Sequence, residues 1–97
     1  MRIVKRGIAG TLESSDVMIT VSENTEGGIE IDLKSIVEKQ FGKQIRRVIS
    51  EKMDELDVKD ALVEVNDKGA LDCTIKARLE SAAYRAAGIQ HVRWEDK

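Results

Sequence analysis

The sequence predicts an α+β fold in which two helices cover one face of a small four-stranded sheet, antiparallel or mixed. Two observations predict it. Short apolar runs typical of strands occur three times before residue 34 and once after residue 60, and apolar residues recur at helical spacing in two longer runs. Each element therefore has one apolar side, and packing both helices on the same face of the sheet buries these sides together.

The first three strands are expected at residues 8–12, 17–21 and 29–33. In the second strand the apolar residues Val17, Ile19 and Val21 share one face. The third strand alternates in the same way, and its charged residues should face water: Glu30, Asp32 and Lys34. Turn-forming residues at 22–28 predict a surface loop between the second and third strands.

The first helix should follow the third strand directly. Ser35 and Glu38 have the spacing of a capping box, in which each side chain accepts a hydrogen bond from an unpaired backbone amide. Gly42 costs a helix about 1 kcal/mol relative to alanine, so a short first turn at 36–40 and a main helix at about 42–56 are predicted. The expected apolar stripe is Phe41, Ile45, Val48, Ile49, Met53 and Leu56.

A fourth strand at residues 61–65 is bounded by turn formers at 66–69. The last helix is expected from about residue 71 to 87, with Gly88 ending it in a left-handed cap. Residues 89–97 form a short tail. The apolar stripe of this helix is Leu71, Ile75, Leu79, Ala82, Ala83 and Ala86. The predicted element order is therefore βββαβα.

Composition excludes several kinds of protein. A length of 97 residues suits a single domain, expected over 1–97, and the net charge of -2 with few aromatic residues predicts no nucleic-acid binding. The apolar runs are far shorter than the ~20 residues of a membrane span, and the start of the chain lacks a secretion signal, so a cytoplasmic protein is expected. One cysteine and one histidine predict neither an internal disulfide nor a metal site.

The polar link at residues 12–16, between the first two strands, is the most informative segment. A serine at the tip of a hairpin is held out to solvent, where another enzyme can join its hydroxyl to a phosphate. We therefore interpret the link as a modification site and expect no catalytic residue in the chain. Ser14 and Ser15 lie in the same turn, and their spacing alone does not separate them.

Cys73 is the alternative nucleophile, with His91 as its base. We expect a structural role instead, because a small cysteine packs easily at the start of an amphipathic helix and unpaired cysteines are commonly buried. His91 is expected to be a loose surface residue of the tail. Trp94, nearby, is expected to dock on this domain or on a partner subunit.

Four segments carry a resemblance to a known family: residues 9–18 (AGTLESSDVM), 37–42 (VEKQFG), 67–73 (DKGALDC) and 77–80 (ARLE). In this order, and over nearly the whole chain, they resemble the acyl carrier (gamma) subunit of bacterial citrate lyase. The expected fold differs from the four-helix bundle of fatty-acid carrier proteins. The Asp-Ser-Leu signature of those carriers is also missing, since Ser14 follows a glutamate and precedes a serine.

The resemblance implies a non-catalytic carrier. In that family the serine corresponding to Ser14 is joined through a phosphodiester to a phosphoribosyl-dephospho-coenzyme A group ending in a thiol, attached by a dedicated holo-carrier transferase. The alpha subunit exchanges acetate for citrate on the thioester of this thiol, and the beta subunit cleaves the citryl thioester to oxaloacetate. The family pattern favours Ser14 over Ser15. Protein made in a host lacking the transferase would be unmodified.

Charged residues near the site have functional and purely structural interpretations. Glu13 and Asp16 would repel the phosphodiester of the group, or guide the transferase, or be ordinary solvated turn residues. Basic residues on the two helices could contact partner subunits or the phosphates of the group, although most exposed helix charges are simply solvated. These basic residues are Lys43, Arg46, Arg47, Lys76, Arg78 and Arg85.

Three other functions stay open at this stage. The closest is the carrier subunit of malonate decarboxylase, which uses the same kind of prosthetic group. The second is an unmodified interaction or regulatory module, the default for a small α+β domain without a catalytic cluster. The third is a cysteine enzyme that depends on Cys73.

Overall fold

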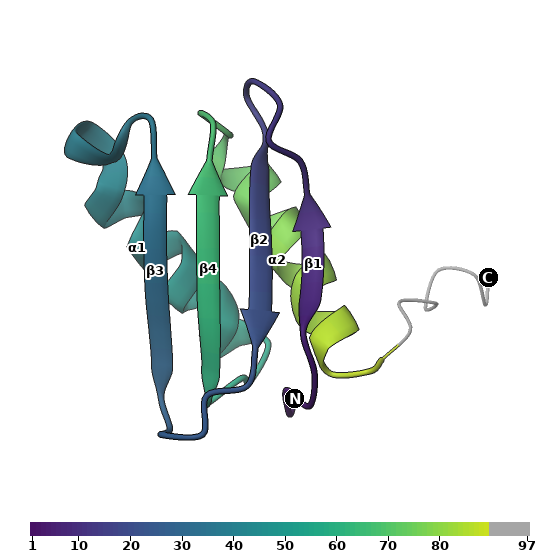
Figure 1. Ribbon diagram of the computed structural model, residues 1–97. Helices are drawn as coiled ribbons and strands as arrows, with labels where there is room; N and C mark the ends of the chain where they lie inside the picture. Colours follow the sequence, from purple (N-terminus) through teal and green to yellow (C-terminus); the bar gives the residue numbers. More distant parts are fainter. Residues whose placement is uncertain (90–97) are drawn as a thin grey trace.

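The computed structural model describes residues 1–89 and confirms the predicted α+β fold and element order. Both helices lie on the same face of the sheet (Figure 1). The predicted tail, with His91 and Trp94, lies outside the described residues except for Ile89. The elements are β1 (Gly7–Gly10), β2 (Val17–Ser22), β3 (Ile29–Ser35), α1 (Glu38–Glu55), β4 (Ala61–Asp67) and α2 (Asp72–Ala86).

The sheet is mixed, with the strand order β1-β2-β4-β3. β2 pairs antiparallel with β1 and with β4, whereas β3 and β4 are parallel and joined through α1. Parallel neighbours need such a crossover connection, which a helix usually supplies. The sequence left the antiparallel and mixed arrangements open, and the structure selects the mixed one.

The core lies between the sheet and the two helices. Val65 of β4 stands opposite Ile19 of β2 and Leu33 of β3, so apolar residues of three strands form a row under the helices. All three are at least 95% buried. The predicted water-facing residues of β3 are exposed on the other face of the sheet, as expected from strand alternation.

Helix α1 differs from the prediction at its start. It runs without interruption through Gly42, so the predicted break there is wrong, as is the capping box. Val37 is the N-cap residue, with no side-chain cap hydrogen bond, and the Ser35 hydroxyl instead donates to Oδ2 of Asp67 at 2.8 Å. Packing over an 18-residue helix outweighs the cost of one glycine, which is about 1 kcal/mol.

The predicted apolar stripes are buried except at their first residues and at Leu56, which is half-buried. Phe41 is 48% exposed and Leu71 is 72% exposed, so their assignment to the core was wrong. Each lies at the start of its helix, beside the loops at one end of the sheet rather than over its middle (Figure 1). Periodicity identifies the apolar side of a helix but not how far the sheet extends beneath it.

The ends of β1 and α2 depend on glycines. β1 ends at Gly10, two residues earlier than predicted, because the chain turns there with a φ of +95°, and Leu12 is exposed as a result. At the other end of β1, Gly7 packs directly on the backbone of α2. Gly88 has a φ of +72°, which confirms the predicted left-handed residue after α2.

Candidate functional site

The candidate site is the loop at residues 11–16, which joins β1 to β2. It stands at the end of the sheet where β3 and β4 also finish and where both helices begin (Figure 1). A Cβ atom at Gly10 would lie 1.8 Å from the carbonyl oxygen of Val17, so only glycine fits at the base of the loop. Ser14 and Ser15 are exposed at its tip.

Asp16 holds the loop together from inside. Its Oδ2 accepts hydrogen bonds from the Thr11 hydroxyl at 2.6 Å and the Thr11 backbone amide at 3.1 Å. Its Oδ1 accepts one from the Val17 amide at 2.8 Å. The Thr11 hydroxyl oxygen in turn accepts a hydrogen bond from the Glu13 amide at 3.2 Å. One carboxylate therefore fixes both ends of the loop.

Arg78 reaches the same carboxylate from α2. Its Nε donates to Oδ1 of Asp16 at 3.1 Å and its Nη2 to Oδ2 at 3.0 Å, a bidentate pair across 62 residues of sequence. The Thr11 hydroxyl and the Arg78 guanidinium, in that order, hold the pKa of Asp16 well below its usual range, because both stabilise the charged form. No pattern in the sequence indicates this arrangement, since residues 16 and 78 meet only in the folded chain.

This pair corrects two expectations. Asp16 is not a freely solvated turn residue, because its side chain is only 15% exposed and fully engaged. Arg78 is not simply a solvated helix charge either, because it compensates the Asp16 carboxylate directly. The repulsion that Asp16 was expected to exert on a phosphodiester is therefore largely neutralised at close range. Glu13 is exposed, as expected.

The loop is also attached to the segment that follows β4. The Ser15 amide donates to the Lys68 carbonyl at 2.8 Å, and the Lys68 amide donates to the Asp16 carbonyl at 2.9 Å. Ser15 has a φ of +65°, an unusual conformation for a residue other than glycine. The Asp16 amide closes the turn by donating to the Glu13 carbonyl at 3.1 Å, with Ser14 and Ser15 at its centre. The backbone of Ser15 is thus held by Lys68, whereas the side chains of both serines are exposed.

Cys73 differs from its expected buried position, because it is exposed in the first turn of α2. It lines an open groove of about 590 Å³ between the start of α1 and the segment joining β4 to α2. His91, its postulated base, lies outside the described residues. Within residues 1–89 no group of three or more metal-ligating side chains is found.

The basic residues proposed as contact patches have several roles. Arg46 donates to the Ile31 carbonyl of β3 at 3.1 Å, and Arg85 donates to the Ile8 carbonyl of β1, so each covers one carbonyl on an edge strand. The remaining predicted basic residues, Lys43, Arg47 and Lys76, are exposed.

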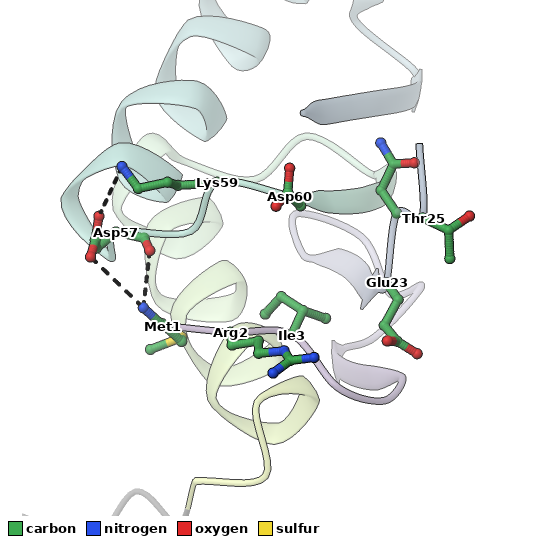
Figure 2. A pocket seen from close by; sticks show the side chains of 9 residues that line it. Met1, Arg2, Ile3, Glu23, Thr25, Asp57, Lys59 and Asp60 are labelled. Carbon is green, nitrogen blue, oxygen red and sulfur yellow. Dashed lines mark hydrogen bonds and ion pairs between the residues drawn. The ribbon is translucent and has the colours of Figure 1, made fainter. Parts of the chain in front are cut away.

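A second hollow is lined in part by Met1 (Figure 2), and the N-terminus lies at the end of the molecule opposite the serine loop (Figure 1). The amino group of Met1 donates to the Asp57 carbonyl at 3.0 Å there, and the Lys59 ammonium lies 3.7 Å from the exposed Asp57 carboxylate. The Lys59–Asp57 contact is a surface ion pair of the kind that contributes little energy. Among the described helices, none has the length and apolar character needed to cross a bilayer.

Comparison with known proteins gives the class of this chain. Residues 4–86 match the family model described as ACP, malonate decarboxylase delta subunit (MdcD). The fold is similar to a chain in a crystal structure of a Pseudomonas malonate decarboxylase hetero-tetramer in complex with malonate, with a TM-score of 0.66, 18% identity and coverage of 84% of each chain. The protein is thus of the small acyl carrier class with an α+β fold.

Relatives of higher sequence identity identify the family within the acyl carrier class. The chain is 54% identical over 96 residues to the citrate lyase acyl carrier protein of Streptococcus uberis, covering 99% of this chain and 94% of the relative. It is 49% identical over 94 residues to the protein of the same name from Vibrio cholerae, with 97% and 96% coverage. The chain belongs to the family of citrate lyase acyl carrier proteins, which confirms the resemblance found in the sequence.

Proposed function

We propose that this protein is the non-catalytic acyl carrier subunit of a citrate lyase and that Ser14 is the attachment point of its prosthetic group. The observation that carries the proposal is the exposed Ser14 at the tip of a loop fixed on three sides, in a chain about half identical to citrate lyase acyl carrier proteins. A hydroxyl that a transferase must reach is expected in such a position.

The residues present fit a covalently attached phosphoribosyl-dephospho-coenzyme A group. Ser14 makes no side-chain hydrogen bond to any residue in the range 1–89, so its hydroxyl is available for a phosphodiester. When attached, the group supplies the thiol that carries the acyl chain as a thioester, and residues 11–16 themselves contain no thiol. The protein supplies position.

Thr11, Asp16 and Arg78 perform this positioning. Their hydrogen bonds tie the loop to β2 and to α2, so the serine stands at a fixed place relative to the folded domain. The Arg78 charge offsets that of Asp16, which lowers the electrostatic cost of placing a phosphodiester two residues away. Tethering at a fixed point raises the effective concentration of the carried group at neighbouring active sites.

The proposed partners are the alpha and beta subunits of the lyase and the transferase that attaches the group. Arg46 and Arg85 each cover a carbonyl of an edge strand, so partner contacts are better sought on the end of the molecule that carries Ser14 than at the sheet edges. Lys43, Arg47 and Lys76 are among the exposed basic residues available for such contacts.

A carrier function in malonate decarboxylase is the second candidate. The family model and the similar fold in the malonate decarboxylase tetramer favour it, but the citrate lyase relatives match at much higher identity. Reconstitution with each set of partner subunits separates the two candidates, since only one of citrate and malonate should be consumed.

The attachment site is tested by intact mass and peptide mapping of protein made together with the transferase. We expect one coenzyme-derived mass increment, on the peptide that contains Ser14. Ser14→Ala should lose both the increment and the activity of the reconstituted lyase, whereas Ser15→Ala and Cys73→Ser should keep both. An increment that persists in Ser14→Ala would refute the assignment, and loss of activity in Cys73→Ser would favour the cysteine enzyme instead.

A further inference from the structure

The groove beside the candidate site has features of a binding site for a flat, uncharged heterocycle. Its walls include the exposed side chains of Phe41 and Leu71, with Val37 and Ile45 contributing further apolar surface. Its polar lining includes Gln44, whose Nε2 donates to Oδ2 of Asp72 at 2.9 Å. None of the residues that line it is a lysine or arginine, so it does not suit a phosphate.

The groove is adjacent to the serine loop through hydrogen-bonded backbone. The Ser15 amide is bonded to the Lys68 carbonyl, and the next residue, Gly69, lines the groove. By the spacing of paired chains and of consecutive Cα atoms, Ser14 and Gly69 lie within about 13 Å of each other. The segments that line the groove, at the start of α1 and between β4 and α2, lie at the same end of the sheet as the serine loop (Figure 1).

We propose that this groove binds the adenine base of the prosthetic group attached to Ser14. The inference rests on the proposed function. Because the thiol is at the far end of the group, the phosphoribosyl and adenosine portions are the ones nearest the serine. Adenine is flat and uncharged, whereas the diphosphate further along carries negative charge that Asp72 would repel.

The Gln44–Asp72 pair can hydrogen-bond to the edge of the adenine base. Adenine presents an amino donor next to a ring-nitrogen acceptor, the pattern that a side-chain amide recognises in bidentate fashion. The Gln44 amide keeps a second N–H and its oxygen, and the Asp72 carboxylate adds acceptor sites. The Phe41 ring, 48% exposed, offers a face on which the base can stack.

Such binding would divide the prosthetic group into two parts. The nucleoside would be held against the protein, and the pantetheine portion with its thiol would remain free to reach the partner subunits. Shortening the mobile part raises its effective concentration within reach of a fixed point. The groove would thus set where the mobile arm begins.

The first experiment titrates the unmodified protein with free 3′-dephospho-coenzyme A and follows backbone amides by NMR. We expect shifts at Gly69, Ala70, Leu71 and Cys73, with adenosine giving the same pattern and pantetheine none. Phe41→Ala should weaken the response at least about fivefold, the lower end of the effect of losing one base–aromatic stack. Ile8→Ala, which removes a comparably exposed apolar side chain elsewhere, should not.

The second experiment uses the modified protein and the exposed Cys73 thiol as a reporter. Alkylation of the Cys73 peptide, measured separately from the thiol of the prosthetic group, should be several-fold slower in the modified than in the unmodified protein. Phe41→Ala should remove this protection. Equal rates in both forms, or groove shifts with pantetheine but not adenosine, would overturn the proposal.

If the backbone amides of the groove shift only when partner subunits are added, the adenine proposal is wrong and the groove binds a protein instead. The titration uses unmodified protein and free ligand, so its outcome does not depend on whether Ser14 carries the group. If attachment to Ser14 is wrong, the peptide map will show it. If adenine binding in the groove is wrong, the titration will show it.

Discussion

Replacing Gly7 by alanine tests how closely β1 packs on α2. The φ angle of Gly7 is not in the left-handed region, so the substitution adds only a methyl group. That Cβ would lie 2.2 Å from the carbonyl oxygen of Ala82 and 2.5 Å from the amide nitrogen of Ala86. Both are backbone atoms of a helix and have no rotamer to change, so β1 must move away from α2 by about 1 Å to restore van der Waals distances.

We expect Gly7→Ala to lower the free energy of unfolding by about 3 kcal/mol. Overpacking a tight contact costs about 1–3 kcal/mol, and a clash with helix backbone belongs at the upper end of that range. For a domain of this size the corresponding fall in Tm is about 12–24 °C. Since stabilities of small domains are about 5–15 kcal/mol, the variant should still fold. The loop that follows β1 would move with the strand.

The measurement is urea unfolding of the unmodified protein followed by circular dichroism, with the slope m held unchanged as a check on two-state behaviour. Gly42→Ala is the matched control, because its Cβ would meet only the flexible Glu38 side chain, at 3.2 Å, and alanine favours a helix. It should raise stability by up to about 1 kcal/mol. A loss below 1 kcal/mol for Gly7→Ala, or an equal loss for both variants, would refute the packing argument.

Two further predictions concern the residues that hold the site. Asp16→Asn should flatten the acid limb of the stability profile: the folded-state pKa of Asp16 is depressed, so its contribution is complete above the usual aspartate pKa of 3.8 and declines as the pH falls below it. Acid unfolding that is unchanged in the variant would contradict this. Asp67→Ala should cost about 2–4 kcal/mol in urea unfolding, because this 1% exposed carboxylate accepts hydrogen bonds from the Ser35 hydroxyl and the Ala70 amide. Asp67→Asn should lose about half as much, and a loss below ~0.5 kcal/mol for alanine would show that these bonds contribute little.

The outcome of the predictions for α1 shows where local rules are overridden. A glycine and a Ser–Glu pair three residues apart suggested a broken helix with a capping box, and both expectations failed. Ser35 bonds to Asp67 instead, a partner that exists only because β3 and β4 lie side by side. A capping box is worth about 1 kcal/mol, which is small enough for tertiary contacts to replace.

Of the candidate site, only the exposed serine turn could be predicted from the sequence. The serine turn was recognisable because turn formers separate two strand-like runs, and the family followed from four short segments in order. Arg78, which fixes the turn from α2, was not recognised, because it meets Asp16 only after β2 and α2 have packed together. The exposure of Cys73 and the groove it lines were missed for the same reason.

The sequence by itself determined the fold class, the order of the elements, the serines exposed between the first two strands and the family. These features follow from periodicity, turn chemistry and short motifs, which act over a few neighbouring residues. Only the tertiary structure decided the mixed strand order, the Asp16–Arg78 pair and the groove beside the serine loop. Each of these joins residues far apart in the chain, and their meeting depends on how the whole sheet and both helices pack.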